Sequence, residues 1–219
     1  MHRIEFTEFG DGMSQLGGGA WFNSKDYWPI CPISKKYLLP VMTIRGNFFP
    51  TERFPSPDLC ITVFISVIYN KGSFYGINSR HFAASDTKEL SSIKKGTSRV
   101  ILHDVGDKEI FMDVDFPYIN KCGMHLVEFT SEEKDEEVQE PDDSLYLSKF
   151  SAFPSWLQDP VIPPPSFSFN LQLLEYDIVK ISPEHEGIFN DGAGYLFLSR
   201  NLRRMKNMDE AGFFIVQYT

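Results

Sequence analysis

The side chains of this chain best suited to catalysis or metal binding are its five histidines and three cysteines. Metal sites need such ligands at short, recurring spacings, and the sequence has no His-x-x-x-His pair or Cys/His cluster of that kind. Cys122 and His125 stand three residues apart, but an extended strand would point their side chains to opposite faces. The sequence therefore predicts no catalytic residue, no metal ligand and no cofactor from this group.

Two histidine-containing segments hold residue types of a Ser-His-Asp site. They are Ser79-Arg80-His81 and His103-Asp104, but the chain has no Gly-x-Ser-x-Gly turn that would expose a serine nucleophile. We therefore expect both histidines to lie at the surface or to be held by hydrogen bonds.

Two glycine-containing segments could approach a ligand. Gly17-Gly18-Gly19 lacks the following helix and the lysine of a phosphate-binding loop, so we predict a tight turn at positive φ. Asn190–Gly194 offers too few oxygen ligands for calcium. We predict a turn there, in which Asp191 bonds to backbone N–H groups.

Strands must position most of these residues, because short apolar runs bounded by Gly, Pro, Asn and Asp recur along the chain. The clearest run is Leu59–Tyr69, whose β-branched residues favour a strand buried on both faces. Two helical segments are expected, Ser85–Lys95 and a short turn within Asn201–Asp209. The predicted fold class is α+β with predominantly antiparallel β structure. The other expected strands are 37–44, 100–103, 109–114, 124–129, 167–174, 194–198 and 212–218.

The order of these elements recurs on the two sides of an acidic segment: a turn with Trp, followed by three strands. Residues 1–130 and 144–219 would then form two degenerate halves, packed together into one globular domain. Residues 131–143 would join them as an exposed acidic loop, because their like charges repel one another and stay solvated.

The residues that reveal this recurrence also resemble the YwqG-like proteins, a family described as the DUF1963 domain of unknown function. The early part of the family pattern is similar to Leu16–Trp21, Trp28–Cys31 and Leu38–Ile44. The late part is similar to Phe153–Gln158, Phe169–Gln172, Asn190–Phe197 and Phe213–Gln217.

The chain departs from the family where some members carry Cys-x-x-Cys, since Ser34 follows Cys31 at that spacing. The resemblance implies a fold of two related, sheet-containing halves and no established activity. Some members are encoded beside secreted polymorphic toxins, which implies that they are immunity proteins.

The net charge of −9 disfavours binding to nucleic acid or to an anionic membrane, and favours a neutral or basic partner. The first fifteen residues lack the apolar core of a signal peptide, and Leu59–Tyr69 is too short to span a bilayer. Three widely spaced cysteines do not form a disulfide framework. We therefore expect a cytoplasmic protein.

Three functions stay open at this stage. The first is a non-enzymatic protein that binds and neutralises a cognate bacterial toxin with a basic surface. The second is a small-ligand-binding housekeeping protein with a cleft between the halves, lined by Trp21, Trp28 and Trp156 unless these pack in the core. The third is an enzyme of unrecognised type. For the first function, the expected partner-binding residues are Glu132, Glu133, Asp135, Glu136, Glu137, Asp142 and Asp143.

Overall fold

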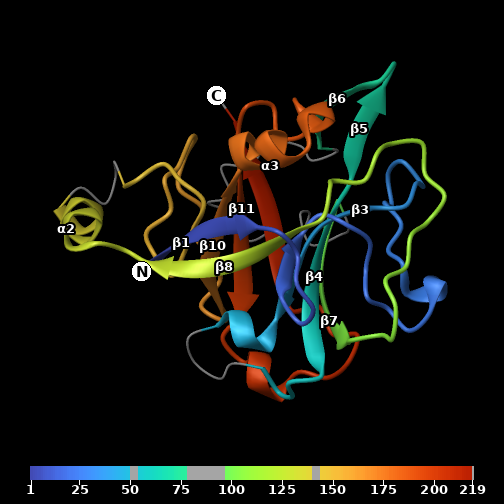
Figure 1. Ribbon diagram of the computed structural model, residues 1–219, viewed down its shortest axis with the longest axis horizontal. Coiled ribbons are helices and arrows are strands. Elements are labelled where there is room, and N and C mark those ends of the chain that lie inside the picture. Colours follow the sequence, from blue (N-terminus) through green and yellow to red (C-terminus); the bar gives the residue numbers. More distant parts are fainter. Residues whose placement is uncertain (50–53, 78–96, 140–143, 219) are drawn as a thin grey trace.

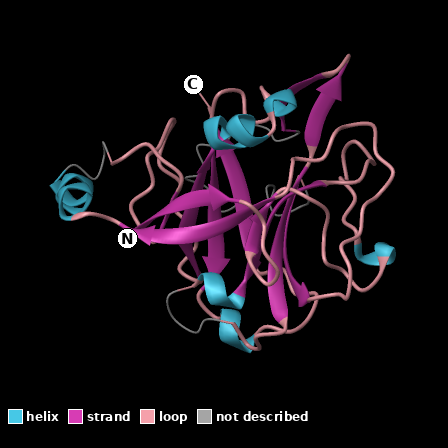
Figure 2. Cartoon of the chain, in the orientation of Figure 1, coloured by secondary structure: helices cyan, strands magenta, loops and turns pink. Residues whose placement is uncertain are grey.

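The computed structural model describes residues 1–49, 54–77, 97–139 and 144–218, and strands dominate its regular structure (Figures 1 and 2). The expectation of an α+β fold with mostly antiparallel strands is confirmed. The strands are β1 (His2–Thr7), β2 (Ser14–Leu16), β3 (Leu39–Arg45), β4 (Leu59–Ile65), β5 (Val67–Asn70), β6 (Ser73–Ile77), β7 (Ser98–Asp104), β8 (Cys122–Glu128), β9 (Lys149–Phe150), β10 (Phe167–Leu174), β11 (Ala193–Ser199) and β12 (Gly212–Gln217).

In the described part of the chain, helical structure is confined to short segments at the margins of the sheet (Figure 2). Two are α-helices and the others are single 3₁₀ turns. They are η1 (Lys25–Tyr27), η2 (Gly46–Phe48), α2 (Ser131–Gln139), α3 (Glu175–Ile181), η4 (Pro183–His185) and η5 (Leu202–Arg204). None of these described helices is long and apolar enough to cross a membrane.

Ten strands form a single antiparallel sheet in the order β12-β11-β10-β9-β1-β8-β2-β3-β4-β7, and β5 and β6 form a separate hairpin. The two ends of this order meet, because the segment before β12 bonds to β7. The Ala211 N–H donates to the Val100 carbonyl at 2.7 Å, and the Leu102 N–H donates to the Asp209 carbonyl at 3.0 Å. The sheet is therefore nearly closed, and it surrounds a core of Ile, Leu, Val and Phe side chains.

Most apolar runs form strands where they were expected. β4 is buried at every position, as its β-branched composition predicts, although the run divides at Ser66 and continues as β5. β10 occupies the whole predicted range of 167–174. η5 confirms the helical turn expected within 201–209, and the helix expected over 85–95 lies outside the described residues.

Two of the predictions of secondary structure are wrong. Residues 109–114 form no strand: Ile110 makes an isolated bridge to Ala20, and the Tyr118 hydroxyl bonds to both the N–H and the carbonyl of Met112. The acidic segment is not a loop over 131–139, where the chain forms α2. Residues 140–143 are outside the described part of the chain.

Candidate functional site

Helix α2 carries five of the seven predicted partner-binding acids, whereas Asp142 and Asp143 lie outside the described residues. The start of the helix explains why so acidic a segment is helical. The Glu133 N–H donates to Thr130 Oγ1 at 3.2 Å, and the Thr130 N–H donates to Glu133 Oε2 at 2.7 Å. This reciprocal capping box satisfies two backbone N–H groups at the helix start. Glu132 and Glu133 in the first turn also interact favourably with the helix dipole.

The outward side of α2 presents carboxylates at the margin of the molecule, where the helix lies beyond the end of β8 (Figure 1). Glu132, Asp135 and Glu136 are exposed. Glu132 and Glu136 are four residues apart, so they share one helical face. We call these three residues the α2 acidic face.

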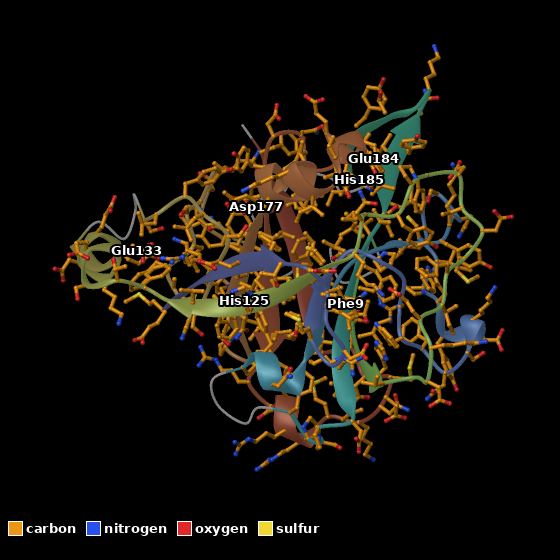
Figure 3. All side chains as sticks on the ribbon, viewed as in Figure 1. Phe9, His125, Glu133, Asp177, Glu184 and His185 are labelled. Carbon is orange, nitrogen blue, oxygen red and sulfur yellow. The ribbon has the colours of Figure 1, made fainter. Side chains whose placement is uncertain are left out.

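Two ion pairs link the first turns of α2 to the sheet. Arg3 Nη1 on β1 lies 3.1 Å from Glu133 Oε1, and Figure 3 shows Glu133 on this helix. Lys134 Nζ lies 2.7 Å from Glu128 Oε1 on β8, and the hydrogen bond from Lys134 lowers the pKa of that carboxyl. These contacts hold the beginning of the helix against the edge of the sheet.

A third ion pair lies at the other end of α2 and is fully buried. Lys149 Nζ of β9 lies 2.9 Å from Glu137 Oε1, and neither side chain has any exposed surface. The Glu137 carboxylate also accepts the N–H groups of Leu145 (3.0 Å) and Phe153 (2.8 Å), while Lys149 donates to Ser144 Oγ at 3.2 Å. Burial lowers the pKa of Lys149. The prediction that Glu137 contacts a partner is wrong, because its carboxylate is enclosed within the protein.

The glycine segment forms the predicted tight turn, with φ of 70° at Gly17 and 76° at Gly18. The Gly19 N–H donates to Glu109 Oε1 at 2.7 Å, and Glu109 Oε2 pairs with Lys121 Nζ at 2.8 Å. A carboxylate of the chain itself therefore occupies the position where a phosphate loop would bind its ligand.

The tryptophan of this turn lies between two cationic side chains. Its indole N–H donates to Gln15 Oε1 at 2.9 Å. The guanidinium of Arg45 lies 5.3 Å from the ring centroid of Trp21, and Lys121 Nζ lies 5.8 Å from it. Among the other tryptophans, Trp28 is buried, and Trp156 stacks on Tyr195 at 4.7 Å between ring centroids.

The strongest nucleophile–base geometry in the described residues is closed to solvent. Cys60 and His103 face each other on β4 and β7, with Cys60 Sγ 3.4 Å from His103 Nε2, and both are buried. Burial raises the pKa of Cys60 to about 12 and lowers that of His103 to about 4. Both groups are therefore neutral near pH 7, and the imidazole is held by Thr62 Oγ1 at 2.8 Å and by the Asp104 carbonyl at 2.8 Å.

The Ser79-Arg80-His81 segment lies outside the described residues, and the Cys122 and His125 candidates differ in exposure. Cys122 is buried, whereas His125 is partly exposed and lies 3.4 Å from Glu5 Oε2 (Figure 3). Asp191 lies in a turn, as predicted, with φ of 59°. The carboxylate that binds N–H groups of this turn belongs to Glu175, which accepts from Gly187 at 2.7 Å and from Asp191 at 3.2 Å. No cluster of three or more potential metal ligands occurs in the described residues.

A groove of about 400 Å³ lies between the β1–β8 strands and η2. Its apolar lining includes Met13, Phe48 and Leu126, and Asn47 adds an amide group. His2 also lines it, and its Nδ1 is a buried atom without a hydrogen-bond partner in the described structure. None of the three tryptophans expected to line a cleft contributes to this groove.

Comparison with known proteins adds no assignment. No protein-family model matches the chain, and no curated protein matches it. The resemblance to the YwqG-like family therefore stays a prediction.

Several residues that shape the site were not identified from the sequence. Thr130-Ser-Glu-Glu133 fits the capping-box pattern and could have revealed α2. Glu109 and Lys149 gave no comparable signal, because each is defined by a partner on a different element of the fold.

Proposed function

We propose that this protein is a non-enzymatic binding protein that neutralises a cognate bacterial toxin, and that the α2 acidic face docks against a basic surface of that toxin. The supporting observation is that ion pairs at both ends of α2 hold Glu132, Asp135 and Glu136 outward in a fixed arrangement. Because the helix is already ordered, docking costs little backbone entropy, and the exposed acids attract a basic partner over a distance of about 10 Å.

The net charge of −9 adds to this attraction, since a molecule with a net negative charge steers a basic partner toward itself. The same charge repels nucleic acid and anionic lipid, so our proposal includes neither as a partner. The neutral, enclosed Cys60–His103 pair favours a binding role over a hydrolytic one. We also propose a cytoplasmic location, where an immunity protein would meet its toxin.

The test is co-expression with the toxin encoded by the adjacent gene. Wild-type protein should restore growth, and the double variant Glu132→Lys/Glu136→Lys should slow association with the toxin by about tenfold at low salt. A matched control, Asp11→Lys/Asp107→Lys, makes the same change in net charge at exposed acids elsewhere. The proposal fails if the toxin still kills in the presence of wild-type protein. The role of α2 fails if both double variants behave alike.

The groove beside His2 favours a second candidate, a small-ligand-binding housekeeping protein. A groove of about 400 Å³ with both apolar and polar lining and one unsatisfied imidazole nitrogen suits a small molecule that combines apolar surface with hydrogen-bonding groups. A thermal-shift screen across metabolite classes tests this candidate. A hit should disappear in His2→Phe, and a screen without any hit argues against it.

A further inference from the structure

A groove of about 290 Å³ lies at one end of the β10–β11 pair, where Phe167 and Ser199 are cross-strand partners. It is separate from α2 and from the groove beside His2. Its described lining consists of Ser168, Ser199, Arg200, Leu202 and Arg203, so the described residues supply two guanidinium groups, two hydroxyl groups and no carboxylate.

The surrounding segment has an unusual charge for this protein. Residues 200–206 contain Arg200, Arg203, Arg204 and Lys206 and no acid, in a chain whose net charge is −9. All four of these cationic residues are exposed. Figure 3 shows nitrogen-tipped side chains that project from the lower end of the molecule, where η5 lies. Four positive charges within seven residues create a local positive potential in a protein whose net charge is negative.

The turn itself is held in place by the fold. The Arg200 N–H donates to the Ser166 carbonyl at 2.8 Å, and its Nε donates to the Phe167 carbonyl at 3.3 Å, which orients the guanidinium. The buried Leu202 anchors the turn in the core. Ser199 Oγ accepts the Asn201 N–H at 3.2 Å, which leaves the hydroxyl hydrogen of Ser199 able to donate.

We propose that this groove binds a phosphoryl group, as inorganic phosphate or as a small phosphate monoester. Guanidinium groups donate in a planar fork that matches phosphate oxygens, and serine hydroxyls add single donors to the same group. A compact dianion experiences mainly the local positive potential. An extended polyanion would also experience repulsion from the acidic remainder of the surface.

The experiment is a titration of the whole protein with inorganic phosphate and, separately, with glycerol 3-phosphate, monitored by amide chemical shifts at constant ionic strength. We expect saturable shifts in residues 199–206, with a dissociation constant of about 1 mM or tighter. Arg200→Gln should weaken binding by about tenfold or more, because it removes a charge-assisted hydrogen bond. Arg200→Lys should weaken it less, since that variant keeps the charge and loses the fork.

Lys108→Gln is the matched control, because it removes one exposed positive charge elsewhere. The proposal is overturned if neither probe gives saturable shifts, or if Lys108→Gln weakens binding as much as Arg200→Gln. Tighter binding of a single-stranded oligonucleotide than of either probe would also overturn it, because the site would then recognise a polyanion. If Arg200→Gln does not fold, as judged by far-UV circular dichroism, Ser168→Ala provides the test, because it removes one of the hydroxyl donors that line the groove. Comparison of the two probes shows whether free phosphate or the ester is preferred.

Discussion

Replacing Glu137 with Gln should remove a large part of the free energy of unfolding of this protein, although it changes only one side-chain atom. The wild-type carboxylate pairs with the ammonium of Lys149 and accepts hydrogen bonds from two backbone N–H groups, in a site closed to solvent. Glutamine keeps one acceptor oxygen but places an NH₂ group among donors. The ammonium of Lys149 would then be buried with only Ser144 Oγ and part of an amide as acceptors.

The size of the loss follows from the two choices left to Lys149. It can stay charged without a counterion, or it can lose its proton, which costs about 5 kcal/mol at pH 7 from an ordinary pKa near 10.5. The cheaper choice sets the cost, and burial already lowers the pKa of Lys149 in the wild type. We therefore expect a loss of about 3–4 kcal/mol, in line with other buried pairs broken on one side. Out of a total of about 5–15 kcal/mol, this is a large fraction.

Urea denaturation of a double-mutant cycle measures this interaction. Lys149→Met alone should cost about 3 kcal/mol, because it leaves the Glu137 charge uncompensated. The double variant Glu137→Gln/Lys149→Met removes both charges and keeps an oxygen for the backbone N–H groups. It should cost at least about 2 kcal/mol less than the sum of the single variants. Asp115→Asn is the control, because the Lys36–Asp115 pair is more than half exposed and should contribute less than about 1 kcal/mol.

Additive costs within about 0.5 kcal/mol would refute the reasoning, since they would show that the two charges do not depend on each other. A cost for Glu137→Gln that is no larger than the cost for Asp115→Asn would refute it equally.

Three further predictions concern other parts of the structure. Burial holds the pKa of His103 at about 4 in the folded protein, against 6.5 in the unfolded chain. As the pH falls, the unfolded chain is therefore protonated first, which favours unfolding. The stability that the folded protein has at pH values above 6.5 should thus decrease as the pH falls from 6.5 to about 4. The loss is about 3 kcal/mol at most, and urea titrations of His103→Leu should show a correspondingly smaller fall in stability over this range. Gly19→Ala would place a Cβ 2.1 Å from the Ile110 carbonyl oxygen, and should lower the free energy of unfolding by about 1–3 kcal/mol. Thr130→Ala removes the α2 cap and should cost about 1 kcal/mol, with faster amide hydrogen exchange in the first turn of that helix.

The strands could be predicted because their sequences carry a strong local signal. β4 and β10 are apolar at most positions, and burial on both faces of a nearly closed sheet requires that composition. The segment 109–114 is apolar at four of its six positions, but it has no partner strand among the described residues. Ile110 is buried and makes a single β-bridge, to Ala20, and the hydroxyl of Tyr118 bonds to the backbone of Met112. An apolar run alone therefore could not separate a strand from a segment that has no strand beside it.

The acidic segment shows what the sequence could not supply. Its charge density indicated repulsion, but three ion pairs offset that repulsion, and their cations come from β1, from β9 and from α2 itself. The sequence correctly predicted that Glu132, Asp135 and Glu136 are exposed. It could not show that Glu137 faces inward, because that orientation depends on where Lys149 lies in the folded sheet.

The two tryptophan-containing turns are held by the same chemistry. In each, a backbone N–H donates to a glutamate, Glu109 for Gly19 and Glu137 for Phe153, and each glutamate pairs with a lysine twelve residues later. The first turn precedes its glutamate in the chain and the second follows it, so duplication does not account for the arrangement in a simple way. A sharp turn directs an N–H group into the protein, and a carboxylate with a paired cation satisfies it. The recurrence therefore reflects a shared physical requirement of the two turns, whether or not the halves share an origin.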